Sequence, residues 1–96
     1  MTTRIELGAG ATVADVVARV RAAAGPAVAL VVAPAVDPVE RALILAAVAP
    51  LALERAPGVR VCAVDAGEGA DPADIDATVD FLAGALATTG QVLRVG

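Results

Sequence analysis

The sequence predicts an α/β domain in which strands and helices alternate as βαβαβαβ and four strands form one mainly parallel sheet. Residues 27–33 are continuously apolar, as expected of a strand buried on both faces of a parallel sheet. Three longer segments each follow a strand-like segment and open with a helix-capping pattern. The 96 residues contain no linker and no internal repeat, so we expect a single domain over residues 1–96.

The first strand and helix are predicted from a change of periodicity. Residues 4–7 alternate charged and apolar side chains, which is the pattern of an edge strand with one solvated face. Thr12, with Asp15 three residues later, forms a capping pattern, and valines then recur at the spacing of one helical face. We therefore expect a helix over residues 12–24, ended by a Gly-Pro pair.

The second unit begins with the central strand at residues 27–33. The sequence Asp-Pro-Val-Glu at residues 37–40 supplies an N-cap acid and a proline at the first helical position, so a second helix is expected to begin there. It should end near Pro57. Pro50 lies inside it and should kink or split it, because the proline ring clashes with the carbonyl four residues earlier.

The last unit repeats the same order. A third strand is predicted at residues 59–64, a third helix begins after Asp71, and a final strand covers residues 91–95. One face of that helix is marked by Ile75, Val79, Leu82 and Leu86.

The strand patterns also predict association. Polar positions in the first and last strands mark them as edges, which favours the order 1-2-3-4. Right-handed crossovers that all step the same way would put the three helices on one face and leave the other face bare. Exposed apolar surface of that kind marks an interaction site, and residues 42–53 of the second helix carry no charge. We therefore expect a homodimer or a hetero-complex with another protein. The expected interface residues are Leu43, Ile44, Ala47, Val48, Leu51, Phe81 and Leu93.

The composition excludes several function classes. The chain has no Ser, His, Lys, Tyr, Trp or Asn, so a Ser-His-Asp triad, a Schiff-base lysine and a phosphate-binding P-loop are impossible. We expect no catalytic residue and no cofactor. A net charge of −4 with no basic cluster argues against nucleic acid as a partner. No apolar run is long enough for a membrane span, no secretory signal opens the chain, and the single cysteine fits a reducing compartment, so we expect a cytoplasmic protein.

A few residues are candidates for a binding site. Gly8, Ala9 and Gly10 lie between a strand and a helix N-terminus, where backbone N–H groups can hold a phosphate. The third glycine of a G-x-G-x-x-G motif is replaced by Val13, which favours an ordinary tight turn.

Acidic, thiol and ion-pair candidates have simpler structural interpretations. Six acids between Asp65 and Asp80 match no calcium-loop spacing and are expected to be solvated or to cap a helix, so no metal is expected. Cys62 is expected to be a small buried hydrophobe. Asp37 and Arg41 are expected to form an ordinary ion pair one helical turn apart.

Several segments in order resemble the C-terminal half of the short-chain dehydrogenase/reductase family. Val-Arg-Val-Cys-Ala-Val-Asp-Ala-Gly at residues 59–67 is similar to that family's Ile-Arg-Val-Asn-Ala-Val-x-Pro-Gly strand. Residues 71–96 resemble its last helix and strand, and residues 51–57 resemble the end of the preceding helix. The resemblance covers residues 27–96 and implies a Rossmann-like half domain. It also implies subunit interfaces on the second helix and on the last helix and strand.

The departures from the family concern its active site. The family's Tyr and Lys fall within about one residue of Asp37 and Arg41, its strand Asn is Cys62, and its substrate lid is reduced to residues 66–70. No glycine-rich cofactor loop of adequate length precedes residue 27. The resemblance thus implies a relative without the cofactor half or the catalytic residues.

These observations favour a non-catalytic interaction module or small subunit. Two alternatives stay open. One is an accessory half of an oxidoreductase whose partner supplies the active site. The other is a nucleotide- or anion-binding domain that uses the Gly8–Gly10 turn.

Overall fold

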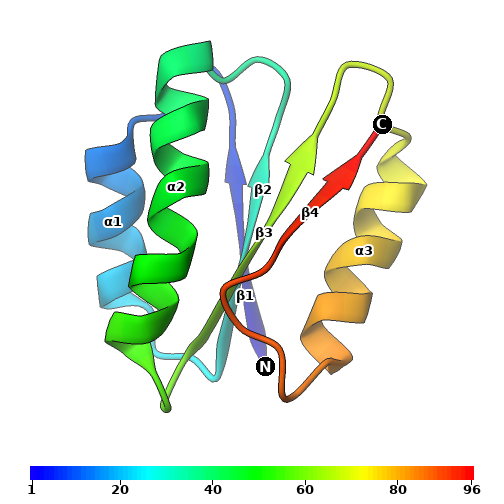
Figure 1. Cartoon of the computed structure of the whole chain (residues 1–96). Helices are drawn as coiled ribbons and strands as arrows, with labels where there is room; N and C mark the ends of the chain where they lie inside the picture. The colour runs from blue at the N-terminus through cyan, green and yellow to red at the C-terminus, as the bar shows by residue number, and fades with distance from the viewer.

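The structure is a computed structural model that describes residues 1–96, and its elements alternate as the sequence predicts. The element order is β1 (Thr2–Leu7), α1 (Val13–Ala22), β2 (Ala27–Val32), α2 (Pro38–Arg55), β3 (Arg60–Ala66), α3 (Pro72–Gly84) and β4 (Val92–Val95) (Figure 1). The strands form one parallel sheet in the order β1-β2-β3-β4. This is a Rossmann-like βαβαβαβ arrangement, and the predicted fold class and strand order are confirmed.

The central position of β2 follows from its composition. It pairs with β1 on one side and β3 on the other, with Leu30 opposite Ile5 and Ala63. All six of its residues are buried. An uninterrupted apolar strand is stable only where both of its faces are covered, and this requirement bears directly on where the helices lie.

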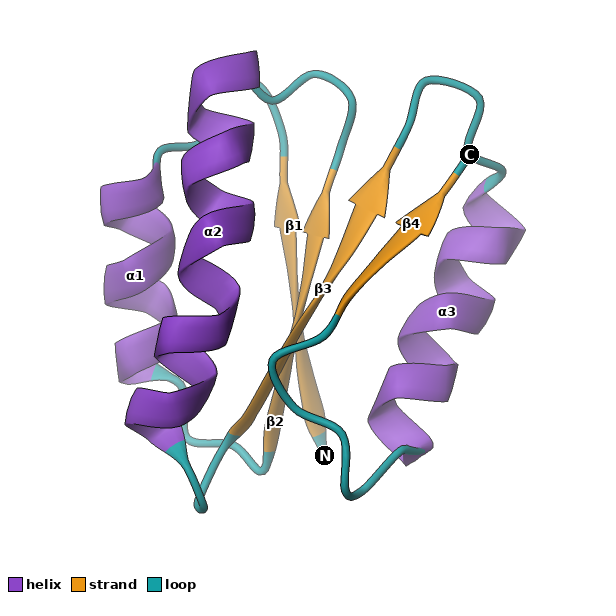
Figure 2. Ribbon diagram, viewed as in Figure 1, coloured by secondary structure: helices purple, strands orange, loops and turns teal.

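The helices cover both faces of the sheet, so the prediction that one face is bare is wrong. Helices α1 and α2 lie on one face and α3 lies on the other (Figure 2). All three crossovers step in the same direction along the sheet, so the crossover through α3 has the opposite hand to the first two. Left-handed crossovers are rare. Here the arrangement buries the second apolar face of β2 and β3, which three helices on one side would leave in water.

The core is divided by the sheet into two unequal parts. Fifteen buried residues, including Val16, Leu30 and Ile44, pack between the sheet and the α1/α2 pair. A smaller cluster of six joins β2 and β3 to Val79 and Leu82 of α3. Most of the apolar burial therefore lies on the α1/α2 side.

The helix starts are held by the capping residues that the sequence indicates. Thr12 accepts from the Asp15 N–H at 3.2 Å, Asp37 from the Val39 N–H at 3.1 Å, and Asp71 from the Ala73 N–H at 2.9 Å. Helix α2 runs unbroken through Pro50, so of the two expected effects of this proline the split does not occur. No helix of the structure has the length and hydropathy to cross a bilayer.

The end of α3 differs from the prediction. The helix stops at Gly84, and Leu86 is 78% exposed in the following loop instead of lying on the buried face. The Arg60 side chain reaches from β3 to the last helical carbonyls, at 3.3 Å from Leu82 and 3.0 Å from Ala85. A cation at this end satisfies carbonyls that have no partner within the helix.

An ion pair between α1 and α2 predicts a pH effect on stability. The Arg21 guanidinium donates twice to the Glu54 carboxylate at 2.8 Å and holds the pKa of Glu54 below its usual value. Because the pKa of Glu54 is lower in the folded state, its ion pair stabilises the protein at pH values above the unfolded-state pKa of about 4.3. This contribution is lost as the pH falls through the folded-state pKa of Glu54. Urea unfolding of the wild type and Glu54→Gln should therefore give curves of stability against pH that differ at neutral pH and converge in acid. Curves that stay parallel down to the acid limit would show that the pair contributes nothing.

Candidate functional site

The carboxyl edge of the sheet is where a ligand site is expected in this fold. The connection after β2 leads to α2 on one face, and the connection after β3 leads to α3 on the other (Figure 1). Open α/β sheets bind ligands at such a switch point, outside the carboxyl ends of the strands. In this chain the strand order does not reverse, and the connections diverge to opposite faces between β2 and β3.

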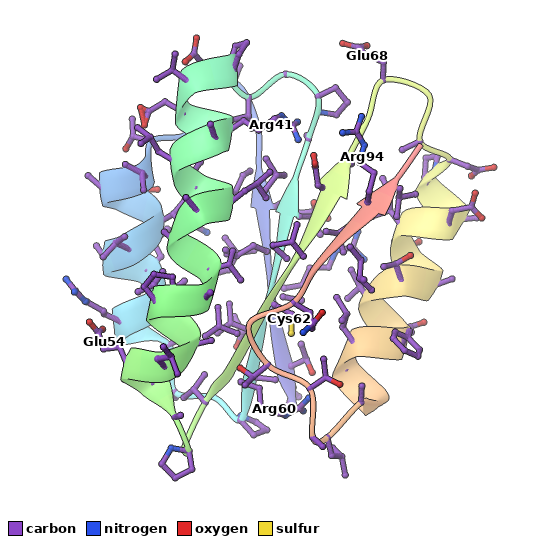
Figure 3. The ribbon with its side chains drawn as sticks, viewed as in Figure 1. Arg41, Glu54, Arg60, Cys62, Glu68 and Arg94 are labelled. Atoms are coloured by element: carbon purple, nitrogen blue, oxygen red, sulfur yellow. The ribbon has the colours of Figure 1, made fainter.

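A partly buried arginine, whose side chain is 21% exposed, ties this edge together (Figure 3). Arg41, in the first turns of α2, donates to the carboxylate of Asp65 at the end of β3 and to the carbonyl of Ala33 after β2. Longer contacts of 3.4 Å reach the carbonyls of Val32 and Ala66. The expected Asp37–Arg41 ion pair is wrong, because Asp37 caps α2 and the long Arg41 side chain turns inward to unpaired strand-end carbonyls.

Asp65 accepts from a second arginine on β4. Arg94 Nη1 lies 3.4 Å from Asp65 Oδ2, and the Asp65 side chain is only 14% exposed. The same guanidinium lies over Gly67, where a Cβ would come within 3.1 Å of Arg94 Nη2 and 2.9 Å of the Gly96 carbonyl oxygen. Each oxygen of the Asp65 carboxylate accepts from one arginine, so the carboxylate links the ends of the strands.

Two shallow hollows flank this edge and share Pro34 and Ala66. One of about 160 Å³ lies beside Arg41, Glu68 and Arg94. The other, of about 220 Å³, lies on the α3 side and is lined in part by the ion pair of Arg4 with Asp76. Both are below the roughly 300 Å³ at which pockets for small organic ligands begin.

The Gly8–Gly10 turn is closed by a bond between Ala11 N–H and the Gly8 carbonyl at 3.1 Å, with Gly10 at φ 85°. The space at the N-terminus of α1 is taken by another part of the chain. Glu40 of α2 reaches across and accepts from the Val13 N–H at 3.0 Å. A phosphate here would meet a carboxylate already bonded to the helix N-terminus, so this end of α1 repels anions.

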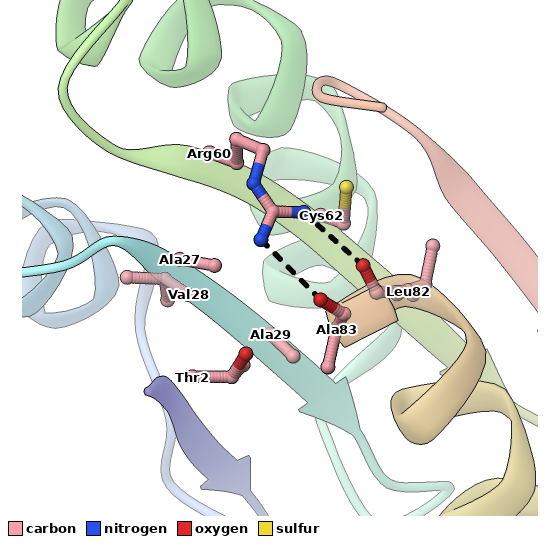
Figure 4. A pocket seen from close by; sticks show the side chains of 8 residues that line it. All are labelled: Thr2, Ala27, Val28, Ala29, Arg60, Cys62, Leu82 and Ala83. Carbon is pink, nitrogen blue, oxygen red and sulfur yellow. Dashed lines mark hydrogen bonds between the residues drawn. The ribbon is translucent and has the colours of Figure 1, made fainter. Parts of the chain in front are cut away.

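The predicted acids and thiol are dispersed. Asp71 caps α3, Asp76 accepts from Arg4 at 2.8 Å, and no three metal-ligating side chains come together. The bond to Asp76, followed by the Glu6 pair, raises the pKa of Arg4. Cys62 is buried as expected, beside a hollow of about 10 Å³ in which Arg60 holds the end of α3 (Figure 4). That hollow has room for little more than one water.

The seven expected interface residues separate into two groups. Ile44, Val48 and Leu51 are at most 4% exposed and face the sheet, which removes them from the expected interface. Periodicity does not show which side of an uncharged helix faces the core. Leu43 and Phe81 are exposed at 47% and 65%, while Ala47 and Leu93 are half-buried.

Sequence reasoning did not find the roles of Glu40, Arg60 and Arg94. Each acts on a group more than twenty residues away, on Val13, Leu82 and Asp65 respectively. No local spacing signals such contacts.

Fold and site together define a Rossmann-like domain whose carboxyl edge is closed by a structural ion-pair network. A family model described as SDR-like, short chain dehydrogenase-like protein, matches residues 5–95. The chain therefore belongs to this short-chain dehydrogenase-like family, and the match extends the resemblance seen over residues 27–96 into β1 and α1. No curated protein and no solved structure matches the chain.

Proposed function

We propose that this protein is a non-catalytic short-chain dehydrogenase-like module that acts by association, first of all with a second copy of itself. The observation that carries the proposal is the outward side of α2. We call this surface the outer α2 face; it consists of Val39, Ala42, Leu43, Ala46, Ala49, Pro50 and Leu53.

The outer α2 face is apolar and exposed. Val39 is 67% exposed, Leu43 47% and Leu53 80%, and none of the seven residues is charged. The opposite side of the same helix is already filled by Ile44, Val48 and Leu51. A helix that is apolar all round is normally buried on all sides, so a partner helix is the simplest cover for the outer face.

Charge favours a second copy as that partner. The acids Asp15 and Glu40 lie in the first turns of α1 and α2, and Arg19, Arg21 and Arg55 lie in their last turns. Two-fold symmetry can pack α2 antiparallel against the α2 of the second copy. The acidic end of each α1/α2 pair then meets the basic end of the other pair. Such a two-fold contact sets the same surface of each copy against the other, with opposite charges meeting at both ends.

The non-catalytic part of the proposal is supported by the use of the two positions that the resemblance aligns with the family's Tyr and Lys. Asp37 caps α2, and Arg41 binds Asp65 and strand carbonyls. The missing residue types leave carboxylates and the buried Cys62 thiol as the remaining acid–base groups. Nucleotide binding at the Gly8–Gly10 turn is not proposed, because Glu40 occupies the helix N-terminus.

The association is tested by a matched pair of leucines. Sedimentation velocity on the wild type should show a dimer at micromolar concentration, and Leu53→Asp should weaken the dimer at least about a hundredfold because a carboxylate would be buried in it. Leu86, similarly exposed at 78% but in the loop that follows α3, supplies the control Leu86→Asp, which should remain dimeric. A monomeric wild type, or a Leu53→Asp protein that sediments as a dimer, would refute the proposal.

The absence of nucleotide binding is tested separately. Differential scanning fluorimetry with millimolar nicotinamide nucleotides should leave the melting temperature unchanged. A ligand that binds only the folded state at one hundred times its Kd stabilises it by about 2.7 kcal/mol, which would be readily seen. A rise in melting temperature that saturates with nucleotide would instead support the nucleotide-binding alternative.

A further inference from the structure

We propose that the outward side of α3 is a second docking surface, independent of the outer α2 face, that takes a basic amphipathic segment of another protein. The surface contains the largest hollow of the molecule, a groove of about 350 Å³ between the end of α3 and β4. We call it the α3 groove. It is lined by Phe81, Leu82, Ala87, Thr88, Thr89, Gln91 and Leu93.

The α3 groove combines an exposed aromatic ring with walls that are apolar at Leu82, Ala87 and Leu93 and polar at Thr88, Thr89 and Gln91. Phe81 is the only aromatic residue of the chain and is 65% exposed on a helix whose buried side is formed by Val79 and Leu82. A ring with most of its surface in water contributes little to the fold, whereas aromatic residues are enriched as anchors of protein interfaces. The groove volume falls within the roughly 300–1,000 Å³ of ligand pockets and suits one or two bulky side chains.

Charge identifies the occupant of the α3 groove. Five of the eleven acidic residues of the chain, and none of its seven arginines, lie between Gly67 and Leu93. Asp74 lies two helical turns before Phe81 on the same side of α3, and Asp80 adjoins Phe81 in the chain. Asp74 and Asp80 accept no side-chain ion pair in the structure, while Asp76 is already paired with Arg4.

The same charges argue against a second copy on this side. Two α3 surfaces placed face to face would bring Asp74 and Asp80 of both copies together around Phe81, while Arg4 is paired with Asp76 and Arg60 is bonded to the carbonyls at the end of α3. A segment that carries a Leu or Phe between Lys or Arg residues satisfies both features. Its apolar side chain fills the groove and its cations approach Asp74 and Asp80.

The test uses a fluorescein-labelled amphipathic peptide of leucine and lysine, with two control peptides. In one control glutamate replaces every lysine, and in the other serine replaces every leucine. Fluorescence anisotropy should show saturable binding of the leucine–lysine peptide that weakens with salt, and at least tenfold weaker binding of both controls.

Variants locate the site. Phe81→Ser should weaken the peptide at least tenfold, as expected for loss of an aromatic anchor, and Asp74→Asn with Asp80→Asn should both weaken it and flatten its salt dependence. Leu53→Asp should bind the peptide like the wild type, and Phe81→Ser should still form the dimer. Failure of the peptide-binding proposal can therefore be distinguished from failure of the dimer proposal. Amide chemical-shift changes should cluster at residues 74–93. Absence of saturable binding, equal binding to Phe81→Ser, or shifts centred on another face would overturn the proposal.

Discussion

Replacing Ile44 with alanine should lower the free energy of unfolding by about 2–5 kcal/mol, the range found when a large aliphatic side chain is removed from a packed core. Ile44 is 0% exposed and lies in the larger cluster between α2 and the sheet. The loss has a large effect here because a core made of small aliphatic residues has no aromatic ring to move into the cavity. Urea unfolding followed by far-UV circular dichroism measures it.

The neighbouring residue on the same helix is the matched control. Leu43 is 47% exposed, so Leu43→Ala should change the stability of the monomer by about 1 kcal/mol or less while weakening self-association. Measurements at low protein concentration separate the two effects, because dimer formation adds to the apparent stability. If Ile44→Ala and Leu43→Ala lower the free energy of unfolding equally, Ile44 does not face the core and Leu43 does not face solvent as the structure has them.

Replacing Arg41 with methionine should cost about 2–4 kcal/mol, since removing one partner of a largely buried ion pair leaves the other charge unpaired. Arg41 and Asp65 have side chains that are 21% and 14% exposed, and residual solvation places the effect in the lower part of the range. Loss of the guanidinium also leaves the strand-end carbonyls of Val32, Ala33 and Ala66 without this donor. Urea unfolding measures the effect.

Two comparison variants show whether the ion pair is the cause. Combining Arg41→Met with Asp65→Leu should restore much of the stability, because no unpaired charge then remains. Arg94→Met should cost far less than Arg41→Met, since Arg94 is 67% exposed and its contact to Asp65 is 3.4 Å. If Arg94→Met proves as damaging as Arg41→Met, the strand ends are held by Arg94 as much as by Arg41.

Element types and their order were predictable because each is encoded locally. The apolar run of β2, the alternation in β1, and the capping residues Thr12, Asp37 and Asp71 act on their own neighbours. Boundaries agree within a few residues. Leu86 was misplaced because helical spacing continues past Gly84, whereas the chain after Gly84 turns back to reach β4.

The sequence predicts which catalytic residue types the candidate site lacks. It does not predict which side chains contact one another there. Counting residue types excludes triads and lysine chemistry whatever the geometry. The partner of Arg41 was predicted to be Asp37 because helix spacing brings residues four apart together. The actual partner, Asp65, is twenty-four residues away and becomes a neighbour only when β2 and β3 pair.

By itself, the sequence determined the alternating fold, the central place of β2 and the lack of side chains for familiar catalytic chemistry, because these depend on local pattern and composition. The tertiary structure decided which face each helix covers, which side of α2 is outward, and that Glu40 and Asp65 are held by distant residues. The hand of the α3 crossover follows from burying both faces of an apolar sheet with three helices. That requirement belongs to the whole domain and to no single segment of it.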